Sequence, residues 1–287
     1  MQTTLQIAAN GLMLGALYAC IAVGFSLVWG VLNVINMLHG SFIVLGGYMA
    51  FFAWRDLGVH PLVSLAVIAG LLFLLGWGLQ YGIINRVVMQ PVLTTLTLTF
   101  GLDMIVYNFM TLAFTATPRR IVLDLGNIEF LGVVMPVDRI VAMVLALALT
   151  GLLFAVLRSS KLGRAIVAVR MDRDAAALMG IRVDRIYAIT FGIGALMAGA
   201  CGSLLAVVYP VTSSMTGLFL GKAFVVCVIG GLGSVPGALI GGLSLGFIES
   251  AAGHWLGPQD AMTIGFVLMI LLLMTKPTGL LGKQGYE

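Results

Sequence analysis

Charged residues are scarce in this sequence, and their scarcity is the first guide to the class of protein. Of the 287 residues, 9% are charged and 61% are hydrophobic, and the mean hydropathy is +1.12. Soluble globular proteins carry about 25% charged residues. These values exclude a soluble domain and predict an integral membrane protein. The basic net charge of +4 then reports on membrane orientation and not on nucleic-acid binding.

Motifs for nucleotide and metal binding are missing too. No GxxxxGK[ST] sequence is present, so the chain does not bind ATP through a P-loop of its own, and no HExxH or paired CxxC motif occurs. Cys20, Cys201 and Cys227 lie far apart inside apolar segments, which favours packing over disulfides or metal ligation. We therefore expect a chain that is not an enzyme and holds no metal or cofactor.

What the sequence does contain is a series of apolar stretches near the ~20 residues that a membrane-spanning helix needs. We expect one all-α transmembrane domain, residues 1–287, with about eight spans, or nine segments if the broken seventh stretch crosses twice. The 37 glycines favour close helix packing and broken or re-entrant helices. The expected stretches are Leu5–Val31, Phe42–Trp54, Leu62–Ile84, Leu93–Ala116, Ile140–Leu157, Ile186–Tyr209, Leu218–Gly253 and Ala261–Met274.

One charged segment, Arg158–Arg185, interrupts the apolar pattern. It holds seven basic and three acidic residues, and its net charge of +4 equals that of the whole chain. A short basic loop between spans marks the cytoplasmic face. Alternation then places the N-terminus and the loop 117–138 outside and Arg86 inside.

Two placements of the C-terminus are open. Lys276 and Lys283 favour the inside, whereas a simple count of eight spans puts the tail outside. A second crossing or a re-entrant hairpin near Pro236 would remove the conflict.

Within the charged segment, RDAAALMG predicts a short cytoplasmic helix. Asp172 and Asp174 stand at its N-terminal end, alanines 175–177 form its body, and Gly180 follows as a C-cap. A face made mainly of alanine, with little bulky apolar surface, suits docking into a groove of a cytoplasmic protein. An amphipathic connector lying on anionic lipid is the alternative.

The sequence NVINMLHGSF places polar residues between the first two apolar stretches. Polar groups inside a membrane are costly and usually face a cavity or a partner, and a broken helix is tolerated only in such places. Asn33, Asn36, His39 and Ser41 are therefore candidates for a polar pathway. The other interpretation is an ordinary cytoplasmic turn in which His39 caps a helix.

The fourth stretch carries several hydroxyls and an acid. Thr94, Thr95, Thr97 and Thr99 lie on several faces of one helix, and most should bond back to its carbonyls. We take Thr97 and Asp103 as further pathway candidates. Asp103 and Glu249 are the acids within apolar spans, and such residues are functional candidates by default; a position near the membrane interface is the alternative for both.

The sequence GGLGSVPGALIGG predicts a helix break, because Pro236 removes a backbone hydrogen bond and glycines flank it. Its role is either a gate or close helix packing. The candidate residues for the break are Gly230, Gly231, Gly233, Ser234, Pro236 and Gly237.

Three of these segments carry a family resemblance in the same order, over residues 5–282. LGRAIVAVRMDRDAAALMGIRVDRI, GGLGSVPGALIGG and NVINMLHGSFIVLGGY resemble the permease subunits of branched-chain amino acid ABC transporters, of the LivH type. The resemblance implies a multi-pass bacterial inner-membrane protein that imports branched-chain or other hydrophobic amino acids. It also implies coupling to an ATPase through Gly163, Arg164, Asp172, Ala175, Ala176, Gly180 and Ile181.

The implied partners are a homologous second permease, LivM-like, two cytoplasmic ATPase subunits that hold ATP and Mg, and a periplasmic binding protein, besides membrane lipid. The alternative is an autonomous secondary transporter or channel for a small polar solute. An ion-coupled transporter is expected to have several charged groups inside the membrane, and in this sequence we assign only Asp103 and Glu249 to that class. Leucine-like, amide, urea and aromatic-acid cargoes, and a homodimer or heterodimer of permeases, stay open.

Overall fold

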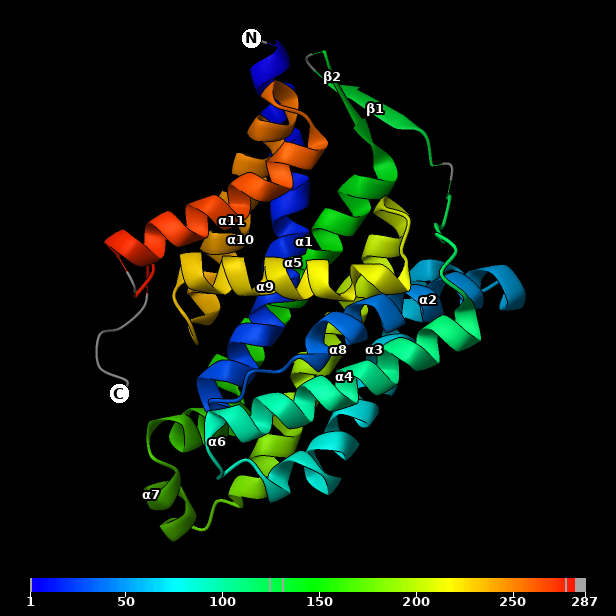
Figure 1. Cartoon of the computed structure of the whole chain (residues 1–287). Helices are drawn as coiled ribbons and strands as arrows, with labels where there is room; N and C mark the ends of the chain where they lie inside the picture. Colours follow the sequence, from blue (N-terminus) through cyan, green and yellow to red (C-terminus); the bar gives the residue numbers. More distant parts are fainter. Residues whose placement is uncertain (1, 124, 131, 277, 282–287) are drawn as a thin grey trace.

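The computed structural model describes residues 2–123, 125–130, 132–276 and 278–281 and is almost entirely helical (Figure 1). Two short 3-10 turns, η1 (Ile84–Arg86) and η2 (Ser213–Met215), and a two-stranded antiparallel sheet of β1 (Asn127–Phe130) and β2 (Val133–Pro136) accompany the helices. The helices are α1 (Gln2–Leu32), α2 (Leu38–Leu57), α3 (Pro61–Gly82), α4 (Val92–Phe114), α5 (Val137–Ser159), α6 (Lys161–Met171), α7 (Arg173–Leu178), α8 (Val183–Val208), α9 (Thr216–Gly230), α10 (Val235–Trp255) and α11 (Pro258–Thr275).

Each expected apolar stretch corresponds to one helix, except the seventh, which corresponds to two. Seven helices of the described residues are long and apolar enough to cross a membrane: α1, α3 with η1, α4, α5, α8, α9 with η2, and α10. α2 and the shorter apolar α11 match the second and eighth expected stretches. The seventh stretch forms two helices, α9 and α10. The prediction of an all-α membrane protein is confirmed, and the β1–β2 hairpin was not predicted.

α1 and α8 form the centre of the bundle and are buried along most of their length, whereas α3, α4 and α5 expose most of theirs. α10 packs antiparallel to α1 at very short range. A Cβ on Gly246 would overlap the backbone of Gly15, and one on Gly242 would overlap that of Ala19. Small residues at a membrane helix interface permit this close approach, which explains part of the high glycine content.

The two ends of the molecule match the expected orientation. The side chain of Gln6 in α1 donates to the carbonyl of Val134 and accepts from its N–H, both at 3.0 Å, so the N-terminus lies beside the hairpin. At the opposite end, Asn85 donates to the carbonyl of Asp184 at 3.1 Å, so Arg86 and the charged segment share a side (Figure 1).

The C-terminal segment returns to the end that carries the charged segment. The N–H groups of Leu280 and Leu281 donate to the carbonyls of Ile229 and Gly230 at 2.9 and 3.1 Å. A Cβ on Gly233, in the adjoining turn, would lie 3.5 Å from the Arg170 guanidinium of α6. Separate helices α9 and α10 therefore bring the C-terminal segment to the end that carries the charged segment, the end that the sequence predicts to be inside; Lys283 lies outside the described residues.

Candidate functional site

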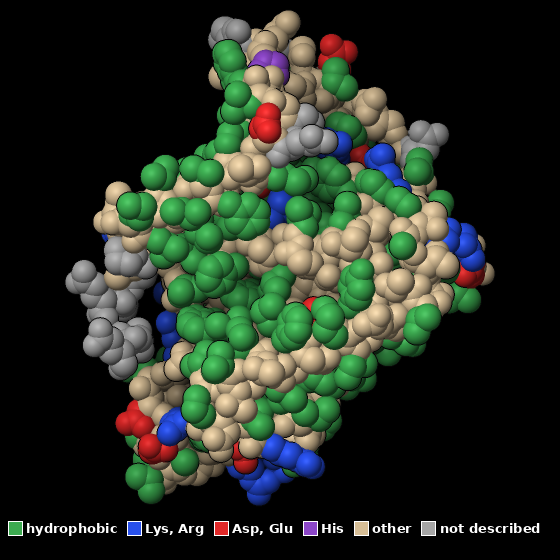
Figure 2. Space-filling model, viewed as in Figure 1, with side chains coloured by type: hydrophobic (Ala, Val, Ile, Leu, Met, Phe, Trp, Pro, Cys, Tyr) green, Lys and Arg blue, Asp and Glu red, His purple; other side chains and the backbone are tan. Residues whose placement is uncertain are grey.

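A cavity of about 730 Å³ lies among α1, α8, α9, α10 and α11. Gln2, Gly132 and His254 are among its lining residues, so it lies toward the end that bears the N-terminus and the hairpin. In Figure 2, viewed as in Figure 1, a recess in the upper half has basic side-chain atoms inside it and hydrophobic side chains around it. Concave sites of roughly 300–1,000 Å³ are the usual size for small-molecule ligands.

A buried ionic network forms part of the cavity wall, with one residue from each of three helices. Lys222 of α9 donates to Glu249 Oε2 of α10 at 2.7 Å, and the hydroxyl of Tyr18 of α1 donates to the same oxygen at 2.6 Å. The Lys222 ammonium also contacts the Tyr18 hydroxyl and lies 4.3 Å from the centroid of its ring. All three residues are at most 7% exposed.

The sequence analysis missed Lys222, and the count of charged groups inside the membrane was wrong for that reason. The signal was present, because the lysine stands alone within the apolar run LFLGKAFVV, and an intramembrane ionisable residue calls for a nearby partner. Glu249 is this partner; the sequence had left open whether it belongs to a functional site or lies near the membrane interface. Neither charge is isolated, which matters because an unpaired charge in such a position is very costly.

The segment between α1 and α2 folds back into the bundle and is not a simple surface turn. Asn33 ends α1 with a φ of 53°, and α2 begins only at Leu38. His39 is fully buried and its Nε2 lies 2.9 Å from the carbonyl of Ile21, about three turns before the end of α1. A Cβ on Gly40 would overlap the Thr216 carbonyl of α9. The expected break is present, and His39 does not cap a helix.

Several polar atoms of this segment are buried without a partner among the described residues. Both amide atoms of Asn36 and the Nδ1 of His39 are such atoms. Ser41 donates to Asp103 of α4 at 2.5 Å, and Thr99 of α4 donates to the carbonyl of Ile35 at 2.9 Å. Buried polar groups of this kind usually have partners, so the cluster is a second candidate site, separate from the cavity.

The structure does not bring all of the predicted pathway residues together. Asn33 is exposed at the end of α1, and Thr97 is exposed on α4, where its hydroxyl donates to the carbonyl of Leu93 at 2.8 Å. The buried threonine that meets the α1–α2 segment is Thr99, which the sequence analysis did not select. None of Asn36, His39, Ser41 and Asp103 lines the large cavity.

The glycine-rich turn between α9 and α10 has the predicted break. Gly231 and Gly233 adopt φ values of 102° and 75°, which side chains other than glycine rarely tolerate. Ser234 caps α10 by accepting from the N–H of Gly237 at 3.1 Å, and Pro236 stands in the first turn of α10. A Cβ on Gly230 would overlap the Gly237 carbonyl, and the reverse also holds. Both tight turning and close packing therefore require these glycines.

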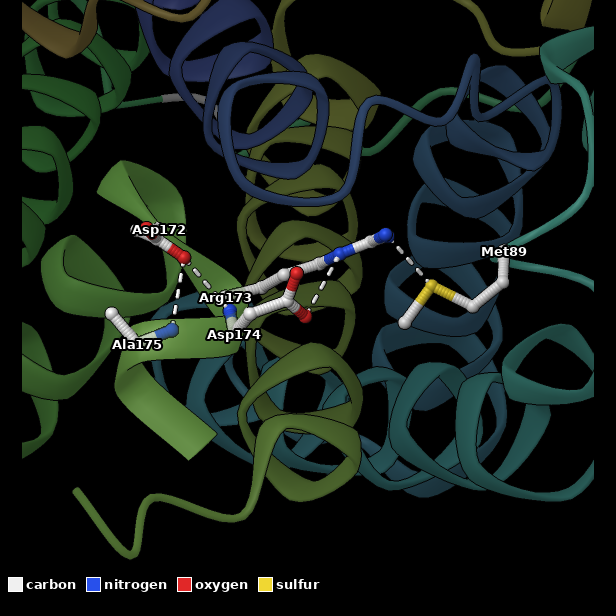
Figure 3. A network of polar contacts seen from close by, with 5 residues as sticks. All are labelled: Met89, Asp172, Arg173, Asp174 and Ala175. Atoms are coloured by element: carbon white, nitrogen blue, oxygen red, sulfur yellow. Dashed lines mark hydrogen bonds and ion pairs between the residues drawn. The ribbon is translucent and has the colours of Figure 1, made fainter. Parts of the chain in front are cut away.

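The charged segment forms two helices, α6 and α7, at the end of the molecule opposite the hairpin (Figure 1). Gly163 lets α6 approach the end of α5, because a Cβ there would overlap the Leu157 carbonyl. Asp172 caps α7 by accepting from the N–H groups of Asp174 and Ala175, both at 2.9 Å (Figure 3). Arg164 and Ala175 are exposed, Ile181 is partly buried, and Gly180 ends the turn with a φ of 84°.

The exposed surface of α7 differs from the one expected. Ala176 is 4% exposed and points into the protein, whereas Leu178 and Met179 are 89% and 83% exposed. The expectation of little bulky apolar surface on this helix was wrong, whereas Ala175 and Ala177 are exposed as expected. The reason is that Ala176 lies on the side of α7 that packs on the bundle, which left the two large side chains outward.

Side chains connect α7 and α8 to the α3–α4 connection. In Figure 3, Arg173 extends from the start of α7 toward Met89, and its guanidinium lies 2.8 Å from the methionine sulfur. Asn85 belongs to the same connection. Its side-chain oxygen accepts a hydrogen bond from the Gln80 amide at 2.9 Å, and its side-chain NH2 donates to the carbonyl of Asp184. α7 therefore contacts the α3–α4 connection as well as α6 and α8.

Comparison with known proteins shows the family of this chain. Residues 7–275 match the family model described as "Branched-chain amino acid transport system / permease component". The chain is 35% identical to the high-affinity branched-chain amino acid transport system permease protein LivH of Escherichia coli, over 97% of this chain and 95% of that protein. It is 35% identical to the corresponding permease BraD of Pseudomonas aeruginosa, over 99% and 97% of the two chains.

A more distant relative is the probable branched-chain amino acid transport permease LivH of Methanocaldococcus jannaschii, 26% identical over 93% of this chain and 89% of the relative. No solved structure matches the chain significantly. The chain belongs to the branched-chain amino acid transport permease family. It is a multi-pass inner-membrane protein and a transport component, not an enzyme.

Proposed function

We propose that this permease is the membrane-spanning subunit of a binding-protein-dependent ABC importer whose cargo is a branched-chain or other hydrophobic amino acid. Its family and the names of its relatives support the cargo class. The sequence has no P-loop, so ATP and Mg would be held by two cytoplasmic ATPase subunits. A homologous second permease and a periplasmic binding protein would complete the importer.

The observation that supports coupling best is the exposed apolar end of α7. Leu178 and Met179 stand out from a segment rich in arginine, at the end opposite the hairpin. Figure 2 shows basic and acidic side chains gathered at this lower end, below a face covered with hydrophobic side chains. Two large apolar side chains in such a place fit a partner's groove, because full burial of each would contribute about 1.5–3 kcal/mol.

Closure of the ATPase dimer would then move α7, and the contacts of Arg173 with Met89 and of Asn85 with Asp184 would pass the motion to α3, α4 and α8. In this proposal Asn36, His39, Ser41 and Asp103 form a polar part of the pathway at the α1–α2 break. The turn from Gly230 to Gly237 would act as a gate, because it packs against the end of α1 at Gly30.

Co-expression with the candidate partner genes tests this proposal. The chain, a second permease and the two ATPases should co-purify in mild detergent. In liposomes they should import leucine only with ATP and the binding protein. A chain that transports alone and without ATP would instead support the alternative, an autonomous secondary transporter or channel.

A further inference from the structure

We infer that Lys222 and Glu249 receive the carboxylate and the ammonium of a zwitterionic amino acid in the cavity among α1, α8, α9, α10 and α11. This inference rests on the proposed function, because it takes an amino acid as the cargo. It adds a binding site and assigns one charged group of the cargo to each residue. Tyr18 would assist as a hydroxyl that bonds to either partner.

The position of the three residues supports this site. Lys222, Glu249 and Tyr18 are wall residues of the cavity, and they come from three different helices, α9, α10 and α1. The 730 Å³ of space is ample for one amino acid, because ligand sites of roughly 300–1,000 Å³ accommodate drug-sized molecules. A pair that served only to join two helices would have no reason to border such a space.

Charge balance also supports the site. The Lys222–Glu249 pair is neutral overall, and so is the zwitterion. When each residue of the pair exchanges its partner for one charged group of the cargo, one ion pair becomes two and no charge is left unpaired. A single fixed charge would trap one end of the cargo and repel the other, and an unpaired buried charge is strongly destabilising. Paired opposite charges avoid both outcomes.

Glu249 has a second carboxylate oxygen that can accept a hydrogen bond from the cargo. The hydrogen bonds from Tyr18 and Lys222 both end on Oε2, and Oε1 accepts none from the described residues. A carboxylate can accept through both oxygens. The ammonium of the cargo can therefore bond to Oε1 before the Lys222 contact breaks, which offers an entry step without an unpaired intermediate.

The remaining wall suits an apolar side chain. Besides the ionic network the wall includes further polar residues, Asn10 and Arg139 among them, and a set of hydrophobic residues. The hydrophobic residues include Leu14, Leu205, Met215, Leu218, Phe219 and Ala261. A zwitterionic head beside the network would leave a leucine-like side chain against these residues, where burial of apolar surface is favourable.

The double variant Lys222→Met with Glu249→Gln tests the inference in the complete importer reconstituted in liposomes. Both replacements are neutral and of similar size, and replacement of a whole buried pair is often neutral for stability. We expect assembly and stimulation of ATP hydrolysis by the loaded binding protein to persist, while leucine uptake falls about tenfold or more, since bonds to charged groups are lost. Ser203→Ala is the control: Ser203 is a buried polar residue outside this cavity, and its hydroxyl donates to the carbonyl of Gly199 at 3.0 Å.

Wild-type uptake by an assembled double variant would overturn the inference and leave the proposed function intact. An importer of wild-type sequence that moves no branched-chain amino acid would overturn the proposed function, and the inference with it.

A second measurement covers a double variant that fails to assemble. The unfolding temperature of the wild-type permease–ATPase complex would be measured with leucine, leucinamide and 4-methylpentanoate at equal high concentrations. A ligand that binds the folded state raises this temperature, and only leucine carries both charges. We expect a rise with leucine alone; equal shifts for all three, or no shift, would refute the two-charge site.

Discussion

Removal of the exposed apolar end of α7 should release the ATPase without unfolding the permease. Leu178 and Met179 are almost fully exposed in the chain, so the double variant Leu178→Ser with Met179→Ser loses little packing within the subunit. Surface substitutions of this kind usually change stability by less than about 0.5 kcal/mol. The subunit should therefore insert and accumulate at the normal level.

The magnitude follows from the area that docking would cover. Full burial of one such side chain contributes about 1.5–3 kcal/mol, but part of this is offset by side-chain ordering on association. A net loss of about 2–4 kcal/mol for the pair corresponds to roughly 30-fold to 1,000-fold weaker association. Titration of the detergent-solubilised permease with the ATPase would measure this ratio directly.

The control lies at the opposite end of the molecule. Leu57 is 76% exposed at the C-terminal end of α2, and Leu57→Ser removes a similar apolar side chain from a surface that the ATPase does not reach. The affinity of the Leu57→Ser variant for the ATPase should equal that of the wild type. If the α7 double variant also bound the ATPase with unchanged affinity and supported full uptake, the docking role of this surface would be refuted.

Three further predictions follow from the packing. Gly202→Ala should lower the unfolding temperature, because its Cβ would overlap the Ile43 carbonyl, whereas Gly70→Ala, with open space around it, should be neutral or stabilising by up to about 1 kcal/mol; equal effects would contradict this account of the glycines. Ser41→Ala removes the bond to Asp103 and should cost about 1.5–3 kcal/mol of stability, measured by thermal unfolding, while Asp103→Leu should assemble but import more slowly; full uptake would remove Asp103 from the pathway. Gly163→Val should separate α6 from the end of α5 and cost about 1–3 kcal/mol, so hydrolysis should continue without uptake, and normal uptake would exclude a need for this close contact.

Hydropathy, helix-breaking glycine and proline residues, and charge in the sequence predicted the main features of the fold. Apolar length located the long helices, and glycine with Pro236 located the turn between α9 and α10. The basic loop predicted the orientation, but α6 within that loop was not predicted. These signals are local in the sequence, so they can be interpreted without knowing which residues are neighbours in the folded protein. The fold-back of the segment before His39 depends on contacts with α1, α4 and α9, and no local pattern reports such contacts.

Which face of a membrane helix points inward was much harder to predict. A helix that is hydrophobic all round has no amphipathic stripe to mark its buried side. Threonines 97 and 99 therefore looked equivalent, although Thr99 meets the α1–α2 segment and Thr97 bonds to its own helix. In α7, six residues long, the pattern was too short to show that Ala176 faces inward.

The ionic network changes how the shortage of intramembrane charge should be interpreted. Scarcity suggests a pathway with few fixed charges, and such a pathway suits a zwitterion because neither end is trapped. Lys222 and Glu249 also avoid trapping one end of the cargo, because they lie 2.7 Å apart and neutralise each other. The pair therefore has no net charge. Exchange of one ion pair for two is close to balanced in free energy, because desolvation offsets most of the gain. A site of this kind would orient cargo and bind it weakly, so that high concentrations are needed to occupy it, and tight binding would belong to the binding protein outside.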